Sequence, residues 1–260
     1  MDALKDIRKI INECDKKIIE NLSLRFSAVE KVTEIKKREK LPIFDSKREK
    51  EIIQSIMNKE MSQASYAAEI YEQILKISRK FQAQNLLPKK IFLIGFMGSG
   101  KSTIGKQLSD ITGFQWVDTD SIIEEKMEMK ISKIFSKKGE KFFRKIEAQV
   151  LQNIEDEENQ IISCGGGIIL KEENRKFLKE KGKIVFLHGD IKTMLDRIEY
   201  DDNRPVLFSA LRDNSDKKYE AFKDILDKRM PLYLEAADVT IEIEKKHPEE
   251  IAKEIINELI

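Results

Sequence analysis

The chain has 260 residues, enough for one large domain or two of ordinary size, and its 40% hydrophobic content suffices to bury a core. Although 37% of the residues are charged, the net charge is only +1, which excludes the strongly basic surface that nucleic acid or an anionic membrane would need. Cys14 and Cys164 have no metal-ligand spacing and indicate a reducing compartment. The start of the chain lacks an apolar signal segment and no apolar run could span a bilayer, so we expect a cytoplasmic protein.

The first third of the chain has helical periodicity. Apolar residues recur three or four positions apart over residues 4–40, with no Gly or Pro between them, which predicts one helix of about 55 Å. Pro42 ends this helix, and further helices are predicted over about residues 46–59 and 62–85. The first helix is too long for the other two to cover, so we expect it to need a partner helix.

After Pro88 the pattern changes to short apolar strands that alternate with amphipathic helices. This alternation predicts an α/β domain with a mostly parallel sheet covered by helices. We therefore divide the chain into an all-helical domain, residues 1–87, and an α/β domain, residues 88–260. The predicted strands are residues 91–94, 115–117, 161–164, 184–187 and 239–243.

The first predicted strand leads directly into a phosphate-binding loop, G-x-x-x-x-G-K-S, at residues 95–102. Its glycines let successive backbone N–H groups point at phosphate oxygens, Lys101 can reach the β- and γ-phosphates, and the Ser102 hydroxyl can ligate Mg²⁺. The helix that follows adds the positive end of its dipole. The sequence thus predicts a nucleotide site whose contacts come from Gly98, Ser99, Gly100, Lys101, Ser102 and Thr103.

Further polar residues follow the later strands. Asp118 and Asp120 come after the second strand, where one carboxylate can hold Mg²⁺ through water and the other can orient a substrate hydroxyl, although turns are rich in Asp for structural reasons too. Arg144 stands three residues before Glu147, a spacing that an ordinary helix pair also explains. Arginines that converge on one pocket suit a planar carboxylate, and an arginine in a polar segment, such as Arg204, can close over phosphates.

Taken in order, these motifs resemble the shikimate kinase family over about residues 90–260. The series is the phosphate loop, D-T-D, G-E-x-x-F-R-x-x-E at 139–147, G-G-G at 165–167, R-P-x-L at 204–207 and R-x-P-L-Y at 229–233. The resemblance implies ATP-dependent phosphorylation of shikimate with Mg²⁺.

The same resemblance implies roles for individual residues. Lys101, Ser102 and Asp118 would serve MgATP, with Ser102 and Asp118 as the metal site. Asp120 would face the hydroxyl that becomes phosphorylated. Arg144 and Arg229 would bind the shikimate carboxylate beside Gly166, Arg204 would be the lid arginine, and Arg197 would lie near adenine.

In the long first helix, basic residues interrupt the apolar face. Arg25 and Lys36 stand in line with core residues at steps of three and four, and Arg8 repeats the pattern near the start. Unpaired buried cations are costly, so this arrangement predicts an anion held in the helical bundle. Extension of the charged ends to solvent, or an internal Glu partner, is the structural alternative.

With the polar residues of the third helix, this pattern resembles the all-helical chorismate mutases over about residues 1–86. The resemblance implies rearrangement of chorismate to prephenate without a cofactor, in a homodimer in which one active-site arginine comes from the other subunit. The family's active-site positions fall on Arg8, Arg25, Lys36, Asp45, Arg48, Glu49, Ser78 and Gln82.

Electrostatic stabilisation would carry this mutase reaction. Arg25 and the other subunit's Arg8 would bind the two carboxylates, and Lys36 and Gln82 would face the breaking ether oxygen. Glu49 also fits an ordinary capping box, Ser46-x-x-Glu49.

The combined hypothesis is a bifunctional enzyme of aromatic amino-acid biosynthesis that binds shikimate and chorismate. One alternative makes the helical domain a non-catalytic dimerisation or chorismate-sensing module. Another keeps the kinase but changes its acceptor to a different small hydroxy acid, such as gluconate. Arg144, Gly166 and Arg229 together favour shikimate.

Overall fold

The computed structural model describes residues 2–154, 157–199 and 215–260. The chain forms two compact units, one that ends at Leu86 and one that spans Leu87–Leu259. Within the described ranges, no helix is both long and apolar enough to cross a bilayer.

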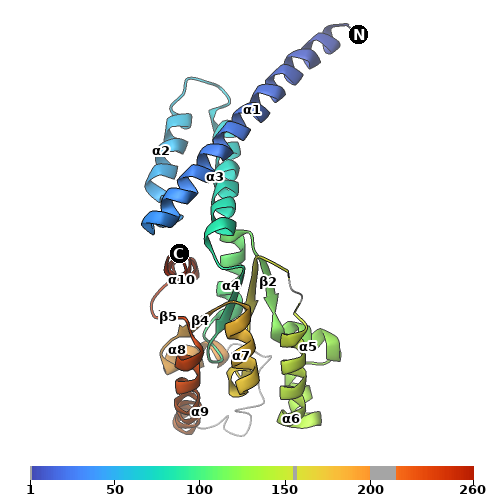
Figure 1. Cartoon of the computed structure of the whole chain (residues 1–260), viewed down its shortest axis with the longest axis vertical. Coiled ribbons are helices and arrows are strands. Elements are labelled where there is room, and N and C mark those ends of the chain that lie inside the picture. The colour runs from blue at the N-terminus through green and yellow to red at the C-terminus, as the bar shows by residue number, and fades with distance from the viewer. Residues whose placement is uncertain (1, 155–156, 200–214) are drawn as a thin grey trace. The chain divides into compact units, whose positions relative to one another are not determined.

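The first unit consists of three helices, α1 (Asp2–Glu39), α2 (Ser46–Met57) and α3 (Ala64–Leu86), in which α1 and α2 both pack against α3 (Figure 1). Their small core includes Ile43, Ile56 and Leu75. The end of α1 before Pro42 and the presence of the two later helices confirm the predicted helical pattern.

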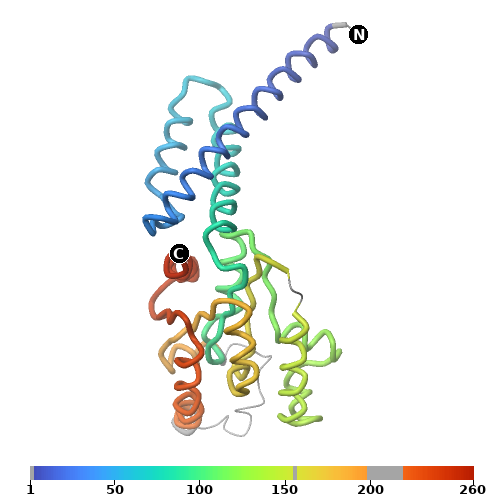
Figure 2. The backbone as a smooth tube through the Cα atoms, viewed as in Figure 1, coloured from blue at the N-terminus to red at the C-terminus, as the bar shows by residue number. Residues whose placement is uncertain are grey.

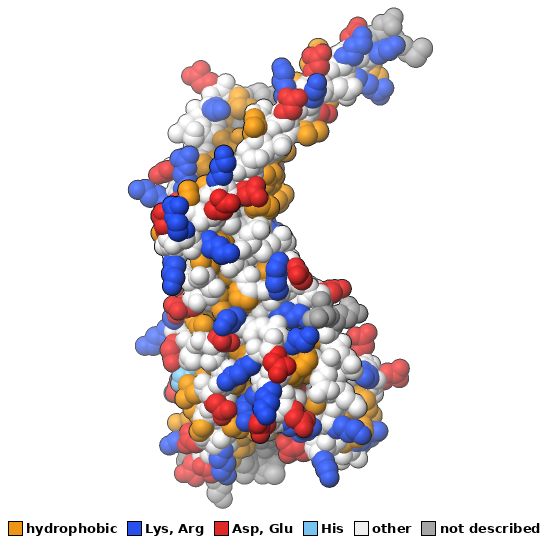
Figure 3. Space-filling view, in the orientation of Figure 1, with side chains coloured by type: hydrophobic (Ala, Val, Ile, Leu, Met, Phe, Trp, Pro, Cys, Tyr) orange, Lys and Arg blue, Asp and Glu red, His pale blue; other side chains and the backbone are white. Residues whose placement is uncertain are grey.

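Only the second half of α1 takes part in this bundle. All side chains of residues 3–21 are exposed, and burial begins at Leu22. The first half of the helix extends beyond α2 and α3 (Figure 2), and hydrophobic side chains lie among its charged ones (Figure 3). Leu4, Ile7, Ile11 and Ile18 are each more than half exposed, because no segment among the described residues covers them.

The second unit contains a five-stranded sheet in the order β2-β3-β1-β4-β5, and every neighbouring pair is parallel. Each predicted strand is present, with bounds that differ by at most a residue or two. The strands are β1 (Lys90–Ile94), β2 (Gln115–Asp118), β3 (Gln160–Ser163), β4 (Lys183–His188) and β5 (Val239–Glu242).

Helices cover this sheet, so the predicted α/β class is confirmed. Phe92, Phe186 and Tyr233 are among the fully buried residues of the main core, and the Phe186 and Tyr233 rings stack with centroids 4.9 Å apart. The covering elements are α4 (Lys101–Thr112), α5 (Thr119–Met127), α6 (Ile131–Gln152), the 3₁₀ helix η1 (Ile168–Leu170), α7 (Glu172–Lys181), α8 (Ile191–Glu199), α9 (Ser215–Ala236) and α10 (Pro248–Glu258).

The strand order determines where a ligand can bind. Since β1 lies between β3 and β4, the chain leaves β1 toward β2 on one side and later returns to β4 on the other. In open parallel sheets, ligands bind beyond the carboxyl ends of the strands at such a switch point. The phosphate loop follows β1, Asp118 ends β2, and the triple glycine follows β3, so all three predicted motifs meet at this edge.

Candidate functional site

The loop after β1 has the backbone of an anion-binding turn. Gly98 and Gly100 have φ angles of 79° and 82°, a region that side-chain-bearing residues rarely occupy. Lys101 begins α4 and is 7% exposed. Its Nζ donates to the carbonyl oxygens of Gly95 and Phe96, each at 2.9 Å, so the ammonium group is held over the loop.

Ser102 and Asp118 form a contact between α4 and the end of β2. The Ser102 hydroxyl donates to Asp118 Oδ2 at 2.6 Å. The other oxygen, Oδ1, accepts the backbone N–H groups of Asp120 and Ser121 at 3.0 and 3.3 Å and thereby caps α5. Hydroxyl and carboxylate oxygens are the ligands that Mg²⁺ prefers, so this donor pair fits the predicted metal site.

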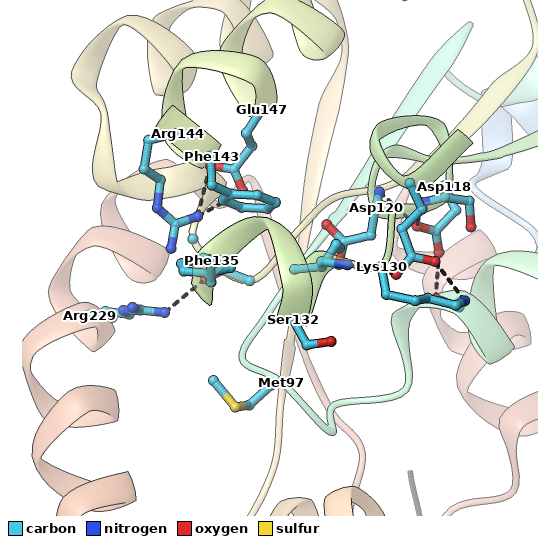
Figure 4. A pocket seen from close by; sticks show the side chains of 16 residues that line it. Met97, Asp118, Asp120, Lys130, Ser132, Phe135, Phe143, Arg144, Glu147 and Arg229 are labelled. Atoms are coloured by element: carbon cyan, nitrogen blue, oxygen red, sulfur yellow. Dashed lines mark hydrogen bonds and ion pairs between the residues drawn. The ribbon is translucent and has the colours of Figure 1, made fainter. Parts of the chain in front are cut away.

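A cavity of about 360 Å³ adjoins this pair (Figure 4). Arg144 and Arg229 lie on one side of it and Asp120 on the other. Two arginines therefore face Asp120 across the cavity, an arrangement that suits a small hydroxy acid. The sequence-predicted residues among its lining are Ser102, Asp118, Asp120, Arg144, Gly166 and Arg229.

Arg144, on α6, is held by a buried carboxylate. Its Nη1 donates to both oxygens of Glu147, each at 2.9 Å, and Glu147 is 1% exposed. Burial raises the pKa of Glu147 to about 7, although Arg144 acts in the opposite direction. A Cβ atom on Gly167 would overlap the Arg144 guanidinium, which explains the glycine there.

Arg229, on α9, lies on the same side of the cavity as Arg144 (Figure 4). Its Nη1 donates to the Gly166 carbonyl oxygen at 3.4 Å, and its guanidinium lies 5.6 Å from the centre of the Phe96 ring. The Tyr233 hydroxyl donates to the same carbonyl at 2.5 Å. Because burial raises the pKa of Tyr233, this hydroxyl stays neutral and keeps its proton.

The sequence predicts two arginines at the nucleotide, Arg197 and Arg204, and the structure describes only the first. Arg197, on α8, has its Nη1 3.5 Å from the Gly98 carbonyl oxygen, at the phosphate loop. Arg204 lies outside the described residues. Thr103 is exposed on the first turn of α4, while Ser99 is fully buried in the loop.

The helical unit brings a second set of predicted residues together between α1 and α3. Arg25 Nη1 donates to the Ser78 hydroxyl, which in turn donates to the Ile74 carbonyl oxygen at 2.7 Å. Gln82 is 8% exposed, and its Oε1 accepts no hydrogen bond from any part of the chain that the structure describes. A buried acceptor without a donor is costly, which suggests that a ligand completes this set.

Lys36 and the start of α2 form the other side of this set. Lys36 Nζ donates to the Ile43 carbonyl oxygen at 2.7 Å, and burial lowers its pKa against the opposing charges of Asp45 and Glu49. Asp45, not Ser46, caps α2, because its carboxylate accepts the Arg48 N–H at 2.9 Å. The expected Ser46-x-x-Glu49 capping box is therefore wrong, and Glu49 is free of that structural role.

Two of the eight predicted mutase residues lie apart from this set. Arg48 is exposed, and its guanidinium pairs with Glu51 at 3.4 Å on the same helix. Arg8 is exposed on the first half of α1. Because each helical residue advances about 1.5 Å, Arg8 lies about 25 Å along the axis from Arg25 and cannot reach the set formed by Arg25, Ser78 and Gln82 of its own chain.

The structure also adds residues that sequence analysis did not assign. Phe135, Lys130 and Ser132 line the kinase cavity, but nothing in their local pattern distinguishes them from ordinary residues of a helix start. In the helical unit, Arg79 bonds to Glu49 across α2 and α3 at 2.6 Å. In the sequence, only the place of Arg79 next to the predicted site residue Ser78 could have pointed to it.

Comparison with known proteins matches each of the two units to a family. The shikimate kinase family model matches residues 97–260, and the model for chorismate mutase type II matches residues 7–83. A shikimate kinase of Thermodesulfovibrio yellowstonii is 43% identical over 170 residues, which is 65% of this chain and 94% of that protein.

Solved structures agree with this assignment. The shikimate kinase of Acinetobacter baumannii in complex with shikimate is 34% identical, with a TM-score of 0.61 over 68% of this chain and 94% of that one. The shikimate kinase of Bacteroides thetaiotaomicron is 30% identical, with a TM-score of 0.59 over 66% and 98%. The chain therefore belongs to the shikimate kinase family and carries a chorismate mutase type II domain ahead of its kinase domain.

Proposed function

We propose that the α/β unit transfers the γ-phosphoryl group of ATP to a hydroxyl of shikimate. The observation that carries this proposal is the cavity in which the six predicted residues meet. Phosphoryl transfer needs mainly positioning and charge stabilisation, and this cavity has Arg144 and Arg229 on the side opposite Asp120. Membership of the shikimate kinase family supports shikimate as the acceptor.

Each side chain has a role that follows from its place. Arg144 of α6 and Arg229 of α9 bind the substrate carboxylate, and Asp120 accepts a hydrogen bond from the hydroxyl that attacks. Lys101 moves from the loop carbonyls to the β- and γ-phosphates when nucleotide binds. Ser102 and Asp118 would hold Mg²⁺, which supplies charge neutralisation at the phosphates.

The direct test of the kinase proposal is a coupled ATPase assay on the intact chain with shikimate and with gluconate. We expect turnover with shikimate and a kcat/KM at least about 100-fold lower with gluconate, because the two arginines form a site for a rigid ring carboxylate. Equal turnover of the two acceptors would contradict the proposed substrate.

For the helical unit, we propose rearrangement of chorismate to prephenate in the pocket of Arg25, Lys36, Ser78 and Gln82. The cations of Arg25 and Lys36, whose hydrogen bonds within the described residues go to neutral oxygens, favour a bound dicarboxylate, and the Gln82 Oε1, which accepts no hydrogen bond from those residues, fits a hydroxyl donor of the ligand. Such a site needs no cofactor, because fixed charges stabilise the developing charge of the transition state. Prephenate formation by the intact chain tests this directly.

We further propose that the mutase pocket is completed by Arg8 of a second copy in a homodimer. The exposed hydrophobic face of the first half of α1 supports this, since contiguous apolar surface marks an interaction site. In a symmetric dimer each subunit would lend its Arg8 to the pocket of its partner.

Complementation between inactive variants tests the shared pocket. Arg8→Ala and Arg25→Ala chains should each lack mutase activity. When equal amounts of the two are unfolded and refolded together, the mixture should show about a quarter of the wild-type mutase activity. Half of the random dimers are mixed, and each mixed dimer has one intact pocket and one doubly altered pocket. Kinase activity measures the recovery of folded protein. Mixtures that stay inactive while kinase activity recovers would contradict the shared pocket.

A further inference from the structure

Arg79, on α3, is a cation that none of the roles above uses. It follows Ser78 directly, and its Nη1 lies 2.6 Å from Glu49 Oε2 on α2. Glu49 is itself one of the active-site residues that the resemblance to chorismate mutases predicts. The ion pair therefore joins a predicted substrate-binding carboxylate to a residue without an assigned role.

The surroundings of this pair restrict its motion. The side chains of Arg79 and Glu49 are 21% and 28% exposed, unlike the neighbouring Arg48–Glu51 pair, whose side chains are 66% and 49% exposed. The Arg79 guanidinium also lies 5.7 Å from the centre of the Phe44 ring, which borders it on another side. A short, half-buried and stacked pair holds its carboxylate more firmly than a surface pair does.

The charges around Lys36 indicate how the Arg79–Glu49 pair would affect the binding of an anionic substrate. The start of α2 places Asp45 and Glu49 near Lys36, and both carboxylates act on its ammonium group. A dicarboxylate that enters such a pocket is repelled by each carboxylate whose charge is not balanced. The Arg25 and Lys36 groups are bonded to a hydroxyl and a carbonyl oxygen, so the contact that directly balances Glu49 comes from Arg79.

We propose that Arg79 is a positioning residue of the mutase site that neutralises Glu49 and fixes its orientation. Arg79 holds Oε2 of that carboxylate and leaves Oε1 as the acceptor for a polar group of the substrate. Arg79 acts on the reaction through Glu49 and does not itself touch the substrate. This inference rests on the proposed mutase activity of the helical unit.

The test compares the intact wild-type chain with Arg79→Gln and Arg79→Lys for mutase KM and kcat, kinase activity and thermal unfolding. We expect Arg79→Gln to raise the KM for chorismate about tenfold, with a smaller loss in kcat, because the uncompensated carboxylate opposes binding of the dianion. Arg79→Lys should recover most of the KM, since an ammonium group still balances the charge. Arg38→Gln, which breaks an exposed pair with Glu39 on α1, is the matched control and should leave both constants unchanged.

A double variant separates positioning from simple support of the fold. If Arg79 acts through Glu49, then Arg79→Gln combined with Glu49→Gln should have a KM no higher than that of Glu49→Gln alone. Multiplication of the two single effects would overturn the inference, as would an Arg79→Gln chain that unfolds at lower temperature but keeps wild-type kinetics. Absence of prephenate formation by the wild-type chain would instead overturn the mutase assignment, and this inference with it.

Discussion

The two sites of this chain differ in how far the described residues of one chain account for them. In the α/β unit, Arg144 is 14% exposed and is held by Glu147 from its own helix, while Arg229 bonds to the Gly166 carbonyl oxygen. In the helical unit, Arg25 and Lys36 belong to one set with Ser78, but Arg8 lies on the exposed half of α1. The ends of parallel strands bring residues of one domain to a single cavity, whereas the mutase site that we propose takes its Arg8 from a second copy.

The largest expected effect tests whether the two pockets work independently. Lys101→Ala should lower the kinase kcat by about 10³-fold, because the ammonium group that stabilises the transferring phosphoryl group is lost. Mutase activity should be unchanged, since each pocket is lined by residues of its own unit. Both rates can be measured on one preparation. Lys106→Ala, an exposed lysine on the same helix, is the control, and loss of both activities in a folded Lys101→Ala chain would contradict independence.

The next effect concerns the affinity of the kinase cavity for the carboxylate of shikimate. Arg229→Ala should raise the KM for shikimate about 100-fold, because one of two charged hydrogen bonds to the carboxylate is removed. The KM for ATP and that for chorismate should change little. Lys228→Ala, the exposed neighbour on α9, is the matched control. An unchanged KM for shikimate in initial-rate measurements would contradict the proposal that Arg144 and Arg229 both bind the carboxylate.

The smallest effect concerns a buried carboxylate, which the described part of the α/β unit has in Glu147. Its pKa of about 7 in the folded chain lies above the ordinary value, so the folded state binds the proton more tightly than the unfolded state. This stabilisation is complete at low pH and is lost as the pH rises from about 4.5 to 7. Relative to Glu147→Gln, the wild type should therefore lose about 3 kcal/mol of unfolding free energy over this window.

Denaturant unfolding at several pH values measures this difference. Glu140→Gln is the control, because Glu140 also contacts Arg144, at 3.2 Å, but is 60% exposed. That variant should keep the wild-type pH dependence. If Glu147→Gln and the wild type have parallel profiles, then Arg144 outweighs burial and the pKa of Glu147 is not raised.

Much of the fold was predictable because its signals are local. The period of the apolar residues located the three helices and five strands, and the G-x-x-x-x-G-K-S loop after a strand located the nucleotide site. The strand order is not a local property, so the meeting of Asp120, Arg144 and Arg229 around one cavity followed from resemblance and not from spacing.

What the sequence did not indicate depends on contacts between elements. The Arg79–Glu49 pair joins α2 to α3 across 30 positions, and no periodicity within either helix marks it. The α2 cap was misassigned because Asp45 and Ser46 are both good capping residues and only the backbone decides between them. Residues such as Lys130 reach the cavity through the turn between α5 and α6, which composition does not describe.

The two carboxylate oxygens of Asp118 accept hydrogen bonds from different groups, and this affects how variants of Asp118 should be interpreted. Oδ1 anchors the first turn of α5, where Asp120 lies, and Oδ2 receives the Ser102 hydroxyl. Truncation to alanine would therefore loosen the residue that we propose orients the acceptor, as well as removing an oxygen from the proposed metal site. Asparagine keeps the anchoring oxygen and replaces only the other one, so the isosteric change isolates metal chemistry where the alanine change cannot.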